Sequence, residues 1–140
     1  MDQKLKSKIE AKIKPHQPAS LATIKDGKPW VRYVMTTGDG LNLYINTDKQ
    51  SRKVAQIEKN ADVHVVLGFA GDMKSMEYVQ VEGTATILTD KKIKEKMWVD
   101  YLSQFFKSPE DPSYVVIKIS PTLIEFYETG EKNPQILKLG

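Results

Sequence analysis

The chain has 140 residues, of which 40% are apolar, so it fits one domain with a modest core. It contains no cysteine, which excludes disulfides, thiolate metal sites and thiol nucleophiles and favours a cytoplasmic protein. The net charge of +3, from 21 basic and 18 acidic residues, is a smaller excess than nucleic-acid-binding proteins carry. No segment has the length of a signal peptide or a membrane span, so we expect neither a nucleic acid nor a membrane as partner.

The N-terminal segment is predicted to be a helix over residues 1–14, because Leu5, Ile9 and Ile13 recur at every fourth position. Beyond it, alternating apolar and polar residues between glycine, proline and Asp-Gly turns predict β-strands. The predicted strands cover residues 19–25, 30–37, 41–46, 63–69, 76–89, 114–119 and 123–127. In the third of these strands the alternation places Tyr44 on the polar face.

Two further helices interrupt the strands. Ser51 is a suitable N-cap for a short helix that ends near residue 60, and residues 91–107 have the spacing of a helix with a broad apolar face. Gly83 marks a bend in the long strand 76–89. This order predicts a mainly β protein, an antiparallel β-barrel with peripheral helices, with the whole chain as one domain and residues 128–140 as its C-terminal tail.

The main candidate site lies in the polar loop that leads into the short helix, at Ser51, Arg52 and Lys53. The first turn of a helix attracts anions, because its amide groups are free and the helix dipole is positive there. Two cations in that turn oppose the dipole unless an anion offsets them. We therefore expect a bound phosphate, although the same residues would also suit an ordinary solvated helix start.

Arg32 is a second candidate, because it lies on the same face of its strand as Val34. Its guanidinium group could complete a bidentate clamp on a phosphate. The alternative is a surface arginine on an edge strand. The sequence leaves both interpretations open.

Other patterns carry less information about function. His16 and His64 have no matching carboxylate pattern, so we expect no metal site. No arrangement of nucleophile, base and acid is found, and we assign no catalytic residue. The aromatic residues Trp98, Tyr101 and Phe105 follow helical spacing, which favours core or dimer packing over a ligand-stacking box.

Five segments in order resemble the pyridoxamine 5′-phosphate oxidase-like family, and the compact length resembles its bacterial general-stress subgroup. The similarity runs from about Pro18 to Tyr127, and Ser-Arg-Lys followed by Gln-Ile-Glu and Asn is its most specific part. The segments are Val31–Met35, Leu43-Tyr44, Ser51–Asn60, Val79–Ala85 and Ile124–Tyr127.

The resemblance implies a six-stranded antiparallel split barrel that forms a homodimer, with FMN, or alternatively FAD, bound at the subunit interface. A deazaflavin or haem ligand is also conceivable within this superfamily. By matching position, the phosphate would be held by Arg32, Arg52 and Lys53 with help from Ser51, the isoalloxazine ring would lie along Val34 and Met35, and further contacts would come from Tyr44, Thr47, Tyr78 and Tyr127.

The C-terminal segment departs from the family pattern. The oxidases end in an arginine-and-histidine stretch that grips the phosphate of the substrate, and residues 130–140 contain neither residue type. The resemblance therefore implies a flavin-dependent oxidoreductase with a small-molecule redox partner other than a vitamin B6 phosphate. One alternative is a flavin-binding module that stores cofactor or senses stress without turnover. Another is a nucleic-acid-binding barrel that uses Trp30–Tyr33.

Overall fold

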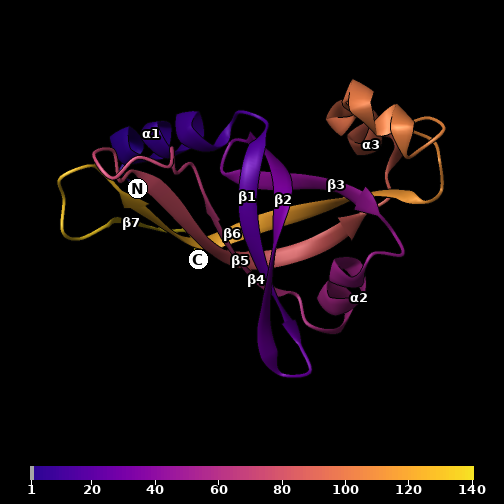
Figure 1. Ribbon diagram of the computed structural model, residues 1–140, viewed down its shortest axis with the longest axis horizontal. Coiled ribbons are helices and arrows are strands. Elements are labelled where there is room, and N and C mark those ends of the chain that lie inside the picture. Colours follow the sequence, from indigo (N-terminus) through magenta and orange to yellow (C-terminus); the bar gives the residue numbers. More distant parts are fainter. Residues whose placement is uncertain (1) are drawn as a thin grey trace.

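The computed structural model describes residues 2–140, and within them it contains three α-helices, one 3₁₀-helix and seven strands (Figure 1). No helix of this described part is long and apolar enough to cross a membrane. In chain order the elements are α1 (Gln3–Ile13), β1 (Gln17–Lys25), β2 (Lys28–Asp39), β3 (Asn42–Asp48), α2 (Arg52–Lys59), β4 (Asp62–Leu67), β5 (Tyr78–Leu88), α3 (Lys91–Met97), η1 (Asp100–Gln104), β6 (Tyr114–Tyr127) and β7 (Gln135–Lys138).

The strands form one antiparallel sheet in the order β3-β2-β1-β4-β5-β6-β7, and a further pairing of β3 with β6 closes six of them into a ring. The closure is possible because β6 is fourteen residues long. Its first part, Tyr114 to Ile119, pairs with β3, and its last part, Leu123 to Phe126, pairs with β7. The predicted six-stranded antiparallel barrel is confirmed, with β7 added at its edge.

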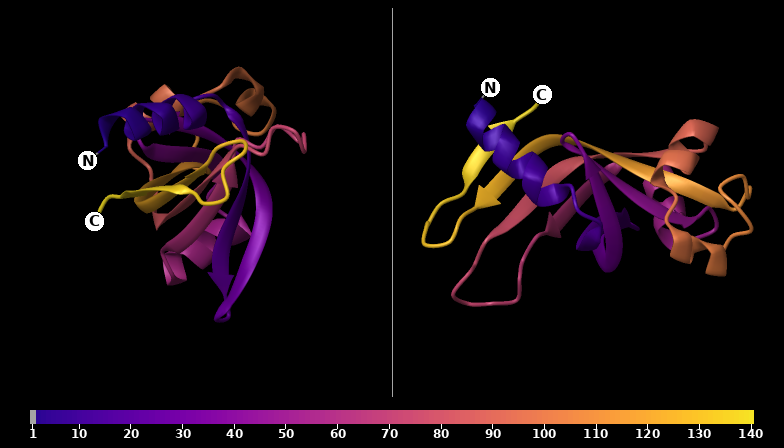
Figure 2. Two further views of the ribbon diagram at one scale, coloured as in Figure 1. Left: turned by 90° about the vertical axis from the view of Figure 1, so that its left-hand side faces the viewer. Right: turned by 90° about the horizontal axis from the view of Figure 1, so that it is seen from above.

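The core fills the barrel because every second residue of each strand points inward. Fully buried examples from three strands are Leu21, Val65 and Ile117. Figures 1 and 2 show α1 and α2 on different sides of the barrel. The apolar stripe predicted for α1 is confirmed, since all three of its residues are buried, and α2 inserts Val54 and Ile57 into the same core. The two helices therefore cover the barrel core at separate places.

The predicted helix over 91–107 is wrong as one helix. The chain leaves the helix at Trp98, whose backbone is extended, and resumes as the short η1 turn. This break allows Trp98 and Phe106 both to contact Tyr114, at ring-centroid distances of 5.5 and 5.2 Å. In a continuous helix Phe105 would share the apolar face instead. Here Phe105 is 70% exposed and Phe106 is buried, so the packing around Tyr114 overrides the helical spacing.

Two smaller expectations are also corrected. Tyr44 is buried and not on a polar face, because α3 and η1 cover that side of β3 and Tyr44 packs in a second core cluster with Met97 and Leu102. The segment 128–140 is not a simple tail, because β7 lies within it and buries Leu137 in the main core.

The bend predicted at Gly83 is confirmed as a β-bulge, since the register between β5 and β6 shifts between Glu82 and Gly83. A Cβ atom at Gly83 would lie 2.5 Å from the carbonyl oxygen of Ser120 and 3.0 Å from Cα of Pro121. Ser120 and Pro121, which lie between the predicted strands 114–119 and 123–127, therefore sit against a glycine, and β6 continues past Pro121 as one strand.

We predict that Gly83→Ala destabilises the fold by about 1–3 kcal/mol, because the added methyl group overlaps backbone atoms that have no room to move. Urea denaturation measures the change in midpoint. Thr84→Ala, at the next and outward-facing position of the same strand, is the matched control and should change little. If Gly83→Ala unfolds at the same urea concentration as the parent protein, the bulge accommodates the methyl group and the prediction is wrong.

Candidate functional site

Arg32 is fixed by hydrogen bonds beneath α2. Its Nη1 donates to the hydroxyl of Thr23 at 2.8 Å and to the carbonyl of Leu21 at 3.1 Å, and its Nη2 donates to Oε1 of Gln56 at 2.5 Å. The hydroxyl of Thr23 donates to the same Gln56 oxygen. Thr23 and Gln56 are buried, and β2 pairs with β1 along its length. Arg32 is therefore a half-buried, oriented guanidinium and not a free surface arginine, although β2 pairs at this position with β1 alone.

Three cations lie close together at the start of α2: Arg32, Arg52 and Lys53. We call them the cation cluster. Burial lowers the pKa of Arg32, and the nearby charge of Arg52 lowers it further. Burial also lowers the pKa of Lys53, the charge of Arg32 adds to this effect, and Asp48 opposes it. Within residues 2–140, none of the three forms a salt bridge. The cluster holds like charges together at an electrostatic cost.

Two hydroxyl groups lie at the same place. Ser51 occupies the N-cap position of α2, as predicted, but its side chain makes no capping hydrogen bond. Instead its Oγ accepts a hydrogen bond from Oγ1 of Thr47 at 3.3 Å. The first amide groups of a helix have no partner within the helix. The start of α2 thus combines free amide donors, hydroxyl groups and the cation cluster, which together suit a phosphate.

The remaining predicted site residues lie elsewhere. Val34 packs against the core and Met35 points outward, 38% exposed. Tyr78 and Tyr127 stack on each other with ring centroids 4.6 Å apart. They lie at the opposite end of β6 from the start of α2, because Ser51 bonds to Asp48, which pairs with the first residue of β6, whereas Tyr127 is its last. At about 3.3 Å per residue that strand spans about 40 Å.

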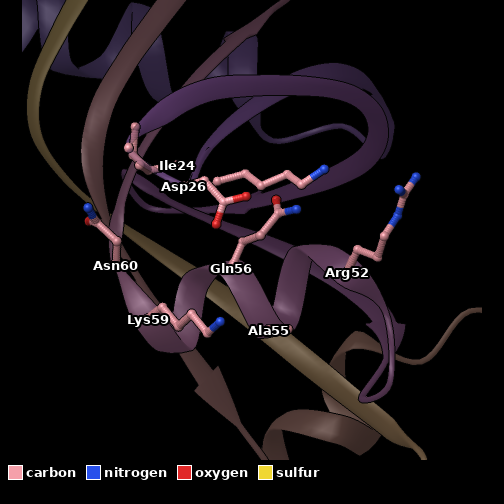
Figure 3. A pocket seen from close by; sticks show the side chains of 9 residues that line it. Ile24, Asp26, Arg52, Ala55, Gln56, Lys59 and Asn60 are labelled. Carbon is pink, nitrogen blue, oxygen red and sulfur yellow. The ribbon is translucent and has the colours of Figure 1, made fainter.

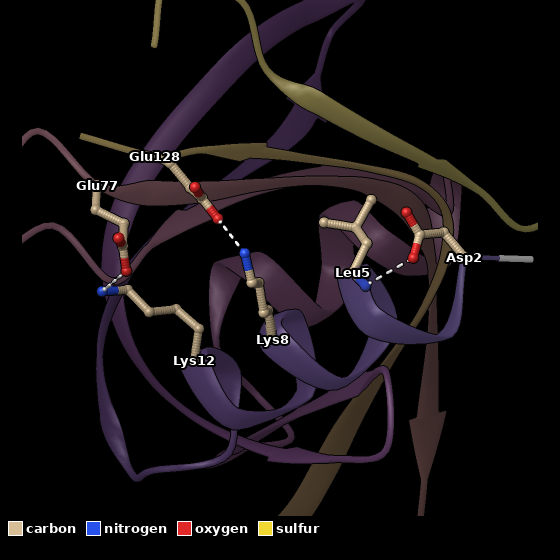
Figure 4. Close-up of polar contacts among 6 residues, drawn as sticks. All are labelled: Asp2, Leu5, Lys8, Lys12, Glu77 and Glu128. Carbon is tan, nitrogen blue, oxygen red and sulfur yellow. Dashed lines mark hydrogen bonds and ion pairs between the residues drawn. The ribbon is translucent and has the colours of Figure 1, made fainter. Parts of the chain in front are cut away.

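Helix α1 is tied to the residues next to this tyrosine pair. Lys12 forms an ion pair with Glu77, which precedes Tyr78, at 3.0 Å, and Lys8 forms one with Glu128, which follows Tyr127, at 2.8 Å (Figure 4). Most of the predicted site residues therefore fall into two groups in one chain: those at the cation cluster, and the tyrosine pair beside α1. Tyr44 belongs to neither group, because its side chain is enclosed by α3 and η1.

Two of the hollows on the surface of the described residues touch the candidate site residues. The first has a volume of about 460 Å³ and lies between the β1–β2 turn and α2, where Asp26, Arg52, Gln56 and Lys59 line it (Figure 3). The second, of about 590 Å³, lies on the outer face of the sheet, and no charged side chain lines it. Its aromatic and sulfur-containing lining residues are Tyr33, Phe69, Met76 and Tyr78. The charged hollow touches the cation cluster through Arg52, and the uncharged hollow touches the tyrosine pair through Tyr78.

The two histidines make no metal centre. His16 contacts the hydroxyl of Thr37 at 2.9 Å and that of Tyr101 at 3.1 Å. His64 lies opposite Glu82 in the β4–β5 register. No group of three or more potential metal ligands occurs in the part of the chain that the structure describes. The phosphate-like cluster is therefore the better-formed candidate site.

Sequence reasoning missed Thr23 and Gln56, which hold Arg32 in place. Gln56 carried one weak signal, because it is a polar residue between Val54 and Ile57 on the buried side of α2. Thr23 gave no such signal, because threonine is an ordinary strand residue. Their contact joins residues 33 positions apart in the chain, which no local pattern reveals.

Comparison with known proteins agrees with this architecture. A family model described as pyridoxamine 5′-phosphate oxidase matches residues 5–128. The chain belongs to this family. The resemblance carried by the five sequence segments is thereby confirmed. The family name describes an activity of other members and by itself assigns no substrate to this chain.

Individual relatives agree with the general-stress subgroup. General stress protein 26 of Bacillus subtilis (strain 168) is 36% identical over 137 residues, which is 98% of each chain. The crystal structure of General Stress Protein 26 from Bacillus anthracis str. Sterne is 38% identical, with a TM-score of 0.84 over 96% of this chain and 98% of that one. A related protein from Clostridium acetobutylicum, 20% identical with a TM-score of 0.78 over 99% and 97% of the two chains, shows that the fold persists at low identity.

We predict that Lys53→Met stabilises the ligand-free protein and raises its Tm by roughly 2 °C, because it removes a half-buried cation and keeps the apolar stem. Since the pKa of Lys53 is lowered from the ordinary value of 10.5, the unfolded chain holds that proton more tightly. The destabilisation is therefore present at neutral pH and fades as the pH rises towards 10.5.

Scanning calorimetry at several pH values measures this difference. Lys49→Met, which removes an exposed lysine of the same loop, is the control and should leave Tm unchanged. If Lys53→Met has a lower Tm than the parent protein at neutral pH, the cation cluster does not destabilise the ligand-free protein and this prediction is wrong.

Proposed function

We propose that this protein binds FMN and holds its phosphate at the cation cluster. The observation that supports this proposal is that three neighbouring cations at the start of a helix, two of them half-buried, form no salt bridge among the described residues. A phosphate dianion would offset these charges and accept hydrogen bonds from the free amides of α2. The hydroxyl groups of Ser51 and Thr47 lie within reach of one another and would add donors.

We also propose that two copies of the chain build each flavin site. In a single chain Tyr78 and Tyr127 lie at the opposite end of β6 from the start of α2, so a flavin held there by its phosphate would more readily meet the tyrosine pair of a second copy. The outer face of β2 carries Val31, Tyr33 and Met35 with exposed fractions of 66%, 86% and 38%. Exposed apolar residues gathered on one strand favour an interface. A homodimer across this face would cover them and could bring the tyrosine pair of the partner to the ring.

The reaction that we propose is a flavin-dependent oxidation or reduction of a small molecule. A bound flavin supplies hydride transfer, and the protein supplies orientation and electrostatics. Arg32, held by Thr23 and Gln56, would fix the position of the phosphate. It would thereby limit where the flavin ring can lie. Residues 130–140 contain no arginine or histidine to grip a substrate phosphate. We therefore propose an acceptor other than a vitamin B6 phosphate.

The alternative function is flavin binding without turnover, as in a stress-related storage or sensing protein. It is supported by the tyrosine pair and the uncharged hollow around Tyr78, which offer packing surfaces but no charged acid or base. Steady-state assays of the flavin-loaded protein with reduced nicotinamides and small acceptors separate the two functions. Sustained turnover supports the oxidoreductase, and tight flavin binding without turnover supports the alternative.

We predict that the purified protein has a visible flavin spectrum and releases about one FMN per chain on denaturation. Arg52→Ala and Lys53→Ala should each weaken FMN binding about tenfold or more, because each removes a charged donor to the phosphate. Riboflavin, which lacks the phosphate, should bind the parent protein about as weakly as FMN binds these variants.

Fluorescence titration of the flavin measures these affinities. Lys92→Ala removes an exposed lysine on α3, away from the cation cluster, and is the matched control. A colourless protein that also ignores added FMN would overturn the proposed function, and equal affinity for riboflavin and FMN would overturn the placement of the phosphate.

We predict that Tyr33→Glu converts the proposed dimer into a monomer, because it buries a charge where the two copies would meet. Light scattering after size-exclusion chromatography measures the molar mass. Phe105→Glu changes another exposed aromatic residue, directly after η1 and outside this face, and should leave the mass unchanged. If the parent protein has the mass of one chain, the two-copy site is wrong.

A further inference from the structure

The uncharged hollow on the outer face of the sheet has a low floor between taller side chains. One row of the strand register crosses it: Tyr33 of β2, Ser20 of β1, Val66 of β4 and Gln80 of β5. The short side chains of Ser20 and Val66 form the floor, with Tyr33 on one side and Tyr78 of β5 on the other. Because neighbouring strands are about 4.8 Å apart, β2 and β5 are separated by about 14 Å. This width admits a molecule of two fused rings.

The walls of the uncharged hollow are aromatic and soft. The ring of Tyr78 is oriented by its stacking on Tyr127, at 4.6 Å between ring centroids and 16° between ring planes. Phe69 and Met76, from the segment between β4 and β5, also line the hollow, and Phe69 is 48% exposed. Aromatic rings stack on other rings, and a thioether packs well against a ring edge. These side chains therefore suit a flat aromatic ligand.

The surroundings of the uncharged hollow favour a ligand without charge. Its polar lining side chains, apart from tyrosine, are the neutral Gln17 and Ser20. Lys12 lies at the rim, since a Cβ atom at Gly68 would be 2.8 Å from its Cε, but its Nζ is paired with Glu77 at 3.0 Å (Figure 4). An ionised ligand would leave water without a counter-charge. A neutral ligand could accept a hydrogen bond from the hydroxyl of Ser20 and lose little.

We propose that the uncharged hollow binds an uncharged, planar aromatic molecule of the quinone class, and that this molecule is the acceptor of the proposed oxidoreductase. The volume of about 590 Å³ lies within the usual range for small-molecule sites. A quinone combines a flat neutral ring with carbonyl oxygens that accept hydrogen bonds. Its reduction to the hydroquinone takes one hydride, which a reduced nicotinamide would supply through the flavin, and one proton from water.

The inference rests on the proposed function, because it names the substrate class of that reaction. In the proposed dimer, the tyrosine pair of one copy would meet the flavin ring held by the other. The uncharged hollow adjoins this pair through Tyr78, so a molecule bound in it would lie beside the ring. The binding itself needs no flavin, and it can therefore be measured separately.

The experiment compares two probes by equilibrium dialysis of the purified protein at neutral pH. The probes are naphthoquinone and its charged analogue naphthoquinone sulfonate. The chain contains no cysteine, so neither probe can form a thiol adduct. Naphthoquinone should bind about tenfold or more tightly than the sulfonate, because the lining offers the sulfonate no counter-charge.

Two variants locate the binding in the uncharged hollow. Phe69→Ala and Tyr78→Ala each remove one aromatic surface and should weaken naphthoquinone binding about fivefold. Phe105→Ala removes an exposed aromatic side chain after η1, outside the hollow, and should leave the affinity unchanged. Circular dichroism establishes that each variant is folded, and Phe69→Ala, which lies outside the strands, retains the test if Tyr78→Ala does not fold.

The outcomes separate this inference from the proposed function. If the sulfonate binds as tightly as naphthoquinone, if neither variant weakens binding, or if riboflavin displaces naphthoquinone, the assignment of the hollow is overturned while FMN binding stands. If the protein binds naphthoquinone in the hollow but ignores FMN, the proposed function fails, and the role as acceptor fails with it. Preference for the neutral probe, lost in both variants and retained with riboflavin present, supports the inference.

Discussion

The buried contact of Gln56 with Thr23 and Arg32 is the interaction on which the candidate site depends. One amide oxygen accepts from a hydroxyl of β1 and a guanidinium of β2, so α2 and the β1–β2 hairpin are joined by a polar contact inside an apolar core. A buried polar group is costly unless every partner is present. This requirement fixes the position of Arg32, and with it the geometry of the cation cluster.

The closed barrel makes such a cluster tolerable. Like charges held together destabilise a protein, and here Lys53 and Arg32 are both moved out of water. The ring of six strands and the insertion of Val54 and Ile57 into the core supply the stability that the cluster lowers. In the proposed function, the start of α2 would keep a shape that a phosphate completes without rearrangement, which is how binding sites reduce the entropy lost on association.

The sequence predicted those parts of the molecule that depend on local pattern. The barrel strands follow from alternation, the bulge from Gly83, and the start of α2 from Ser51, because each is set by neighbouring residues. The helix over 91–107 failed because Tyr114, a distant partner, makes Phe106 and not Phe105 the buried ring. The support of Arg32 and the charged hollow could not be predicted, since both arise where chain segments far apart in sequence meet.

The two ion pairs from α1 have a consequence for how the molecule responds to salt. Lys8–Glu128 and Lys12–Glu77 are partly exposed, and exposed pairs weaken as dissolved ions screen them. The cation cluster behaves in the opposite way, because added anions relieve its repulsion. A rise in ionic strength would therefore weaken the attachment of α1 beside the tyrosine pair. At the other end it would reduce the repulsion among the charges of the cation cluster. We therefore expect the two ends of the paired strands β5 and β6 to respond to ionic strength in opposite ways.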